Sequence, residues 1–161
     1  MKRSAVMSMI VAAVVVAGTA LSMTGCITIQ PRGGATTGGG MNVPVNATGA
    51  SNVGSLEFEL VYDSTVLQAV GVEKGTLAGN AMMDFATARP GRVWVGIVDS
   101  NGISGNGSLV VVSFREVGQG AATGQLTLEN IEAYDAQTLI DIITQATPGN
   151  LSTPPTIVFN P

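Results

Sequence analysis

The sequence contains no histidine and only one cysteine, Cys26, in 161 residues. Histidine is the commonest general base and metal ligand at neutral pH, so its absence excludes a Ser-His-Asp triad and histidine-ligated metal centres. One cysteine cannot form an intramolecular disulfide or a site of several thiolates. A folded domain in this chain must therefore be stabilised by its hydrophobic core, for which about 100 residues are enough.

Basic residues are also scarce. Lys and Arg number 7, Asp and Glu number 11, and the formal net charge is −4. Lys2 and Arg3 belong to a segment that we expect to be removed, and subtracting these two from 7 leaves 5 basic against 11 acidic residues, a net charge of −6. Phosphate binding requires clustered Lys and Arg, so nucleic acid is not an expected partner.

Met1 to Gly25 has the pattern of an export signal, with two basic residues ahead of an uncharged apolar run. Small residues precede Cys26 and resemble a bacterial lipobox, although Met23 stands where leucine is usual. This pattern predicts cleavage before Cys26 and lipidation of its thiol. An uncleaved anchor and plain secretion remain open alternatives. We expect an exported protein, lipid-anchored to the cell membrane or outer membrane, with its domain outside the cytoplasm.

The composition changes twice after this signal. Residues 26–41 hold the cysteine and a Gly/Thr-rich stretch without apolar periodicity, which predicts a flexible linker. Residues 42–147 carry the β-type pattern and form the expected domain. Residues 148–161 are rich in proline, and either a loose tail or a terminal strand at Thr156 to Phe159 fits them.

The stretch from Gly54 to Val72 has the clearest periodicity in the domain. Leu56, Phe58 and Leu60 alternate with polar residues, which is typical of a strand with one buried face. Asp63 and Ser64 then offer turn chemistry before a second extended run. We therefore expect a strand, a corner and a strand, in which Tyr62, Asp63 and Leu67 are structural and Asp63 accepts backbone N–H bonds.

Similar short runs recur along the rest of the domain. Strands are expected at Met41 to Thr48, Asp84 to Ala88, Val93 to Val98, Leu109 to Phe114, Gly124 to Asn130 and Thr138 to Gln145. Ala50 to Val53 is expected to be a turn, and Asp99 to Ser108 a loop. Trp94 is expected in the core rather than on a ligand-binding platform. Eight or nine strands without a convincing helix predict an all-β jelly-roll sandwich.

Three of these segments carry a family resemblance. They are VPV at Val43, LEFELVYDSTVLQAVGVEKG from Leu56, and VWVGIVDSNGISGNGSLVVVSF from Val93. Together they resemble a cohesin domain over about Asn42 to Gln145. The positions that carry the pattern are Tyr62-Asp63, Val66-Leu67, Gly75, Asp99 and Gly102. The resemblance implies a nine-stranded jelly roll whose flat sheet face binds a dockerin, a small calcium-loaded helical module.

Site residues follow from the resemblance by position. It implies partner contacts at Ser55, Glu57, Asp99, Asn101 and Gly102, and outward Glu59 and Val61 would share the face. Glu57 and Asp99 could accept hydrogen bonds from dockerin side chains. Calcium belongs to the dockerin, so no cofactor or metal is expected on this chain. The sequence is shorter between Gly75 and Arg92 than most cohesins, and Ala86 to Ala88 stands where an aromatic contact residue sometimes occurs.

Other readings of the same residues are weaker. Glu57 and Glu59 are neighbours on one strand face, whereas a glycosidase pair must flank a sugar bond. Asp99, Asn101 and Asn106 offer one carboxylate, whereas calcium takes about six to eight oxygen ligands. We therefore expect no enzyme, and a module that docks a dockerin-type partner in polysaccharide degradation. A direct carbohydrate-binding sandwich and a structural envelope lipoprotein remain alternatives, with polysaccharide a second candidate partner.

Overall fold

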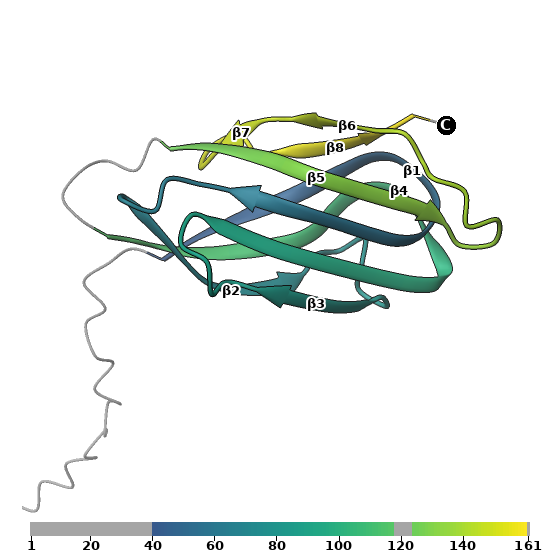
Figure 1. The fold of residues 1–161 in the computed structure, drawn as a ribbon, viewed down its shortest axis with the longest axis horizontal. Coiled ribbons are helices and arrows are strands. Elements are labelled where there is room, and N and C mark those ends of the chain that lie inside the picture. The colour runs from purple at the N-terminus through teal and green to yellow at the C-terminus, as the bar shows by residue number, and fades with distance from the viewer. Residues whose placement is uncertain (1–39, 118–123, 161) are drawn as a thin grey trace, which may run out of the picture. The chain divides into compact units, whose positions relative to one another are not determined.

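The structure is a computed structural model in which residues 40–117 and 124–160 are described. Eight strands make up this part of the chain: β1 (Gly40–Val61), β2 (Leu67–Lys74), β3 (Met82–Ala86), β4 (Arg92–Glu116), β5 (Gln125–Asp135), β6 (Thr144–Thr147), β7 (Gly149–Asn150) and β8 (Thr156–Phe159) (Figure 1). These residues contain no α-helix and hence none that could cross a membrane. The predicted signal and Cys26 lie outside the described residues.

Two long strands, β1 and β4, organise the fold. They pair antiparallel over their whole length, from Gly40 opposite Arg115 to Val61 opposite Arg92 (Figure 1). The first half of β1 and the second half of β4 lie in one layer, with β2, β8 and β6. The other two halves lie in the second layer, with β3, β5 and β7. The predicted all-β jelly-roll sandwich is confirmed.

The turn and the loop predicted in the middle of these strands are wrong. Ala50 pairs with Gly105 and Val53 with Ile103, with register shifts on either side of each pair. Gly102 and Gly105 have φ angles of 76° and 115°, a region that glycine adopts without steric cost. Glycine and asparagine here form bulges that bend two paired strands from one layer into the other, so the ladder continues where the composition indicates a break.

The chain returns to the first layer at its C-terminal end. Thr156–Phe159 forms β8, which lies parallel to β1 from Asn46 to Thr48 and buries Ile157 and Phe159. This is the terminal strand, the second of the two alternatives for the segment. The strand predicted at Thr138 to Gln145 is wrong in extent, because residues 136–138 form a turn and β6 begins only at Thr144.

The core between the layers has the predicted alternation. Leu56, Phe58 and Leu60 are at most 2% exposed, and Phe58 and Phe114 are among the largest fully buried side chains. Val93, Val95 and Ile97 of β4 are buried in the same way. The prediction that Trp94 lies in the core is wrong, because its phase on β4 directs it to the outer face.

The corner after β1 is built by its own polar groups. Tyr62 is buried, packs edge-on against Phe114 with ring centroids 5.1 Å apart, and accepts a hydrogen bond from the Ala69 N–H. Asp63 accepts hydrogen bonds from the Thr65 hydroxyl at 2.7 Å and from the Thr65 N–H at 2.8 Å, which lowers the pKa of its carboxyl. Leu67, the first residue of β2, is then buried. This corner fixes the point at which the chain leaves the second layer for the first.

Candidate partner-binding face

The outer face of the second layer presents side chains in four cross-strand rows. The first row is Met82, Val98, Ser55 and Tyr134, and the second is Asp84, Gly96, Glu57 and Glu132. The third is Ala86, Trp94, Glu59 and Glu129, and the fourth is Arg92, Val61 and Thr127. Residues two apart on a strand share a face, and a register shift on β5 keeps both Glu132 and Glu129 on it although they are three apart, so the members of these rows all face outward. The face is therefore apolar at one end and charged at the other.

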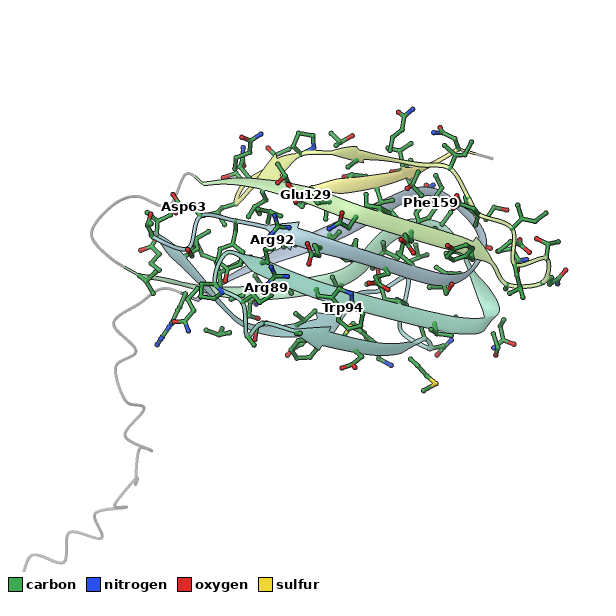
Figure 2. All side chains as sticks on the ribbon, in the orientation of Figure 1. Asp63, Arg89, Arg92, Trp94, Glu129 and Phe159 are labelled. Carbon is green, nitrogen blue, oxygen red and sulfur yellow. The ribbon has the colours of Figure 1, made fainter. Side chains whose placement is uncertain are left out.

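An ion-pair network occupies the charged end. The Arg92 guanidinium donates to the Glu59 carboxylate at 2.6 Å and to the Glu129 carboxylate at 2.9 Å, and Arg89 lies 3.8 Å from Glu59 (Figure 2). These hydrogen bonds raise the pKa of Arg92, with the bond to Glu129 contributing most and the bond to Glu59 next. The Asn130 side-chain amide also donates to Glu59. Both carboxylates of the third row therefore have cationic partners within the chain.

Trp94 lies over the sheet between the network and the apolar end. Its indole N–H donates to the Glu57 carboxylate at 2.5 Å. The indole covers Gly96, since a Cβ added at Gly96 would lie 2.9 Å from the Trp94 Cη2. The lack of a side chain at Gly96 is what allows the ring to lie against the strand, where Trp94 is partly buried.

A groove of about 470 Å³ runs over the first two rows and ends at Trp94. Met82 is 78% exposed, Val98 54% and Tyr134 38%, so its apolar wall is open to solvent. Asp84, Glu57 and Glu132 provide its carboxylates. Isolated exposed hydrophobic residues are common, but apolar side chains gathered around a groove are typical of an interaction site.

The residues expected to bind a partner fall into two groups. Ser55, Glu57, Glu59 and Val61 lie on this outer face, and Ser55 and Glu57 line the groove. Asp99, Asn101 and Gly102 follow Val98 on β4 and are not among the groove residues. There the Asp99 carboxylate accepts from the Asn101 N–H at 2.9 Å, and Gly102 packs against Asn52. These three residues shape the bend of β4.

Sequence reasoning missed most of the groove wall. Trp94 is predicted in the core but lies on the outer face, and Met82 beside it is 78% exposed. The phase of the Val93 to Val98 run places Trp94 with Gly96, and a glycine there is a signal that an aromatic ring has room. The alternation in Val93 to Val98 does not predict which set of side chains faces solvent, because the residues on both faces of this strand are apolar or glycine.

The chemistry of this face is that of recognition. Among the described residues, no group of three or more Asp, Glu, His or Cys is arranged to hold a metal ion. Glu57 and Glu59 are successive outward residues of one strand, and Glu59 is paired with Arg92, so they do not flank a cleft as glycosidase carboxylates do. A jelly-roll sandwich with an open groove on one flat sheet face defines a class, the β-sandwich binding modules.

Comparison with known proteins identifies the family. The cohesin domain model matches residues 27–151, and the chain belongs to the cohesin family. Cohesin domains are non-catalytic binding modules. No curated protein is significantly similar in sequence to this chain.

Solved structures give the same family. A non-cellulosomal cohesin from the hyperthermophilic archaeon Archaeoglobus fulgidus is 33% identical, with a TM-score of 0.61, over 76% of this chain and 80% of that one. The sixth cohesin of Acetivibrio cellulolyticus scaffoldin B, solved with a Cel5 dockerin, is 19% identical, with a TM-score of 0.61, over 75% and 88%. A cohesin from a type I cohesin–dockerin complex of Clostridium thermocellum is 15% identical, with a TM-score of 0.60, over 76% and 85%. The last two show likeness of fold.

Proposed function

We propose that this chain is a non-catalytic module that docks a dockerin-type partner on the outer face of β3, β4, β1 and β5. The observation that carries the proposal is the open groove on this face in a member of the cohesin family. Three exposed side chains, Met82, Val98 and Tyr134, supply apolar area that a partner would remove from water. Any calcium would be held by the partner.

The test uses the chain from Ile27 onward, which contains the whole family match and every described residue. Immobilised chain is exposed to purified calcium-loaded dockerin modules, with and without EDTA. Val98→Asp places a charge on the apolar row and should weaken binding at least about a hundredfold, as for a residue at the centre of an interface.

Val70→Asp is the matched control. Val70 is 55% exposed against 54% for Val98, but it lies on β2 in the other layer. It should bind dockerin like the unchanged chain. Retention of no dockerin, or equal loss in both variants, would contradict the proposed function and its face.

Direct binding of carbohydrate is the second candidate. Trp94 and Tyr134 favour it, because both are at the surface of the groove and sugar rings stack on aromatic faces. Sedimentation with insoluble polysaccharide tests it. If the chain sediments with the polysaccharide and the Trp94→Ala variant does not, sugar binding is supported. If the unchanged chain sediments with no polysaccharide, sugar binding is contradicted and the dockerin proposal remains.

We also propose that the chain is exported and anchored through lipid on Cys26. The support is the sequence pattern of residues 1–26 alone. Expression in a bacterial host with a clickable fatty acid should label the full chain in the membrane fraction. Cys26→Ser should lose the label; label that persists in this variant would contradict lipidation at Cys26.

A further inference from the structure

One long edge of the sandwich, formed by β6 and the loop before it, differs in chemistry from the other edges. We propose that this edge is the contact between two copies of the chain, which pair β6 with β6 about a two-fold axis. The edge is separate from the flat face that carries the groove, so the dimer does not depend on the proposed function.

Residues 140–147 form this edge in both layers. The Ile142 N–H donates to the Ala133 carbonyl, which joins the segment to β5 in the second layer. The Asn160 N–H donates to the Ile143 carbonyl, and β6 then pairs with β8 in the first layer, along the upper rim of the molecule in Figure 1. Among the described residues, no strand pairs with the other side of β6.

The loop before β6 exposes three aliphatic side chains. Leu139 is 74% exposed, Ile140 66% and Ile143 71%. Leu139 has a φ of 56°, a left-handed conformation that is rare for leucine, and its N–H is bonded to the Asp135 carbonyl. A strained turn that is held by hydrogen bonds and presents apolar side chains to water is typical of an interaction site.

The free side of β6 also lacks the protection that other edges have. Exposed strand edges can pair with another chain, and charged side chains or bulges usually prevent this. The edge strand β2 carries Glu73 and Lys74 and has a register shift between Ala69 and Gly71, and β3 carries Asp84. β6, with the sequence TQAT, has no charge and no register shift. It is therefore available for pairing.

The distribution of charge favours a second copy as the partner. Asp141 is the only charged residue among residues 136–160, whereas the chain from Ile27 onward has 5 basic and 11 acidic residues, a net charge of −6. Two such chains repel when their carboxylates face each other, and this edge lets them meet with few carboxylates between them. A membrane is a poorer partner, because residues 136–160 have no Lys or Arg to attract anionic lipid.

The hydrogen bonds of β6 define the register of the pair. Alternate residues of an antiparallel strand bond to the same neighbour. Ile143 and Gln145 bond to β8, so the N–H and C=O groups of Thr144 and Ala146 point to the free side. A two-fold axis at Gln145 places Thr144 of each copy opposite Ala146 of the other, and Ile143 beside Thr147. Each copy then supplies both the donors and the acceptors that the other needs.

The size of this contact predicts a weak dimer. A four-residue strand and three aliphatic side chains per copy lie near the lower limit of specific interfaces, about 1,200 Å², so we expect a Kd of about 10–100 µM. The two-fold axis of an antiparallel pair is perpendicular to the sheet. The outer faces of the two second layers therefore point the same way, and the dimer presents two grooves side by side.

Sedimentation velocity of the chain from Ile27 onward tests the dimer. The protein is measured from about 1 µM to about 500 µM, which brackets a micromolar Kd. It should sediment as a monomer at the lowest concentration and mostly as a dimer at the highest. High salt should tighten the dimer severalfold, because it screens the repulsion between two acidic chains. A chain that stays monomeric at the highest concentration in high salt overturns the proposal.

Three variants locate the contact. Ile143→Asp adds a carboxylate beside the axis in each copy and should weaken the dimer at least about tenfold. Ala146→Pro removes one free-side N–H, leaves the bonds of β6 to β8 in place, and should also prevent the dimer, with circular dichroism confirming the fold. Val70→Asp on the edge strand β2 is the control and should dimerise like the unchanged chain. Dimerisation by Ile143→Asp and Ala146→Pro at the control level overturns the assignment.

Two further measurements exclude other uses of this edge. Dockerin retention by Ile143→Asp should equal that of the unchanged chain; loss of retention would make the edge part of the docking site and overturn the dimer. The chain is also floated with phosphatidylcholine vesicles and should stay unbound. Flotation that Ile143→Asp abolishes would assign the three aliphatic side chains to a lipid surface instead.

Discussion

Gly96 controls the position of Trp94. A Cβ at this residue would lie 2.9 Å from the indole, a distance at which the ring must move. Gly96→Ala should therefore swing the indole off the strand and weaken dockerin binding about tenfold through loss of the aromatic surface at the end of the groove. The Trp94 fluorescence maximum should shift in the unbound chain, which is measured directly.

Gly71→Ala is its control. Gly71 lies on β2 in the other layer, and nothing lies within 4 Å of an added Cβ there. Alanine stabilises a strand relative to glycine, so neither variant should unfold. Binding by Gly96→Ala that equals binding by Gly71→Ala would show that the indole position does not matter.

Asp135 should make stability depend on acid pH. Its carboxylate accepts hydrogen bonds from the Thr138 and Gln137 N–H groups, the Thr138 hydroxyl and the Asn52 amide, which lower its pKa from 3.8 to about 2. The folded pKa lies below the unfolded value, so its stabilising contribution is present above pH 3.8 and is lost as the pH falls toward 2.

Asp135→Asn tests this dependence. The variant should melt a few degrees below the unchanged chain at pH 6, and the gap in Tm should close as the pH is lowered toward 2. Thermal melts followed by circular dichroism give the two curves. A gap that stays constant over this range would mean that the ionised carboxylate is not what stabilises the turn.

At the scale of elements, β8 completes the first layer. Ile157 is fully buried, and the strand lies between β1 and β6. Ile157→Ala should lower the free energy of unfolding by about 2–5 kcal/mol, the usual cost of truncating a buried isoleucine. Urea denaturation gives this value. Val158→Ala on the same strand is the control, because Val158 is only half-buried, and its cost should be distinctly smaller.

Elements were predicted best where one face is polar. In Leu56 to Leu60 the alternation with Glu57 and Glu59 fixed both the strand and its buried face. The segments around Ala50 and Gly105 were predicted as irregular, yet they pair with each other. Their glycine and asparagine residues indicate a bend in each strand. The pairing continues through the bend because both strands bend at the same place, which leaves bulges rather than a break in the ladder.

At the scale of the whole molecule, its acidity should speed association with a basic partner. The chain from Ile27 onward lacks Lys2 and Arg3, so 5 basic residues stand against 11 acidic ones and the net charge is −6. Long-range attraction to a basic partner therefore raises the association rate and is screened by salt. Stopped-flow measurements with a basic, calcium-loaded dockerin module should show an association rate that falls about tenfold from low to high ionic strength. The dissociation rate should change much less. An association rate independent of salt would contradict electrostatic steering.

The sequence by itself determined the fold class, the buried face of the strand from Leu56 to Leu60 and the Tyr62-Asp63 corner, because alternation and turn chemistry are local properties. It also placed Ser55 and Glu57 on an outward face. Only the tertiary structure decided that Trp94 faces solvent, that β1 and β4 pass through both layers, and that Glu57 stands opposite Glu132. Those facts depend on the register between strands far apart in the chain, and register is set by how both faces of the sheet pack together.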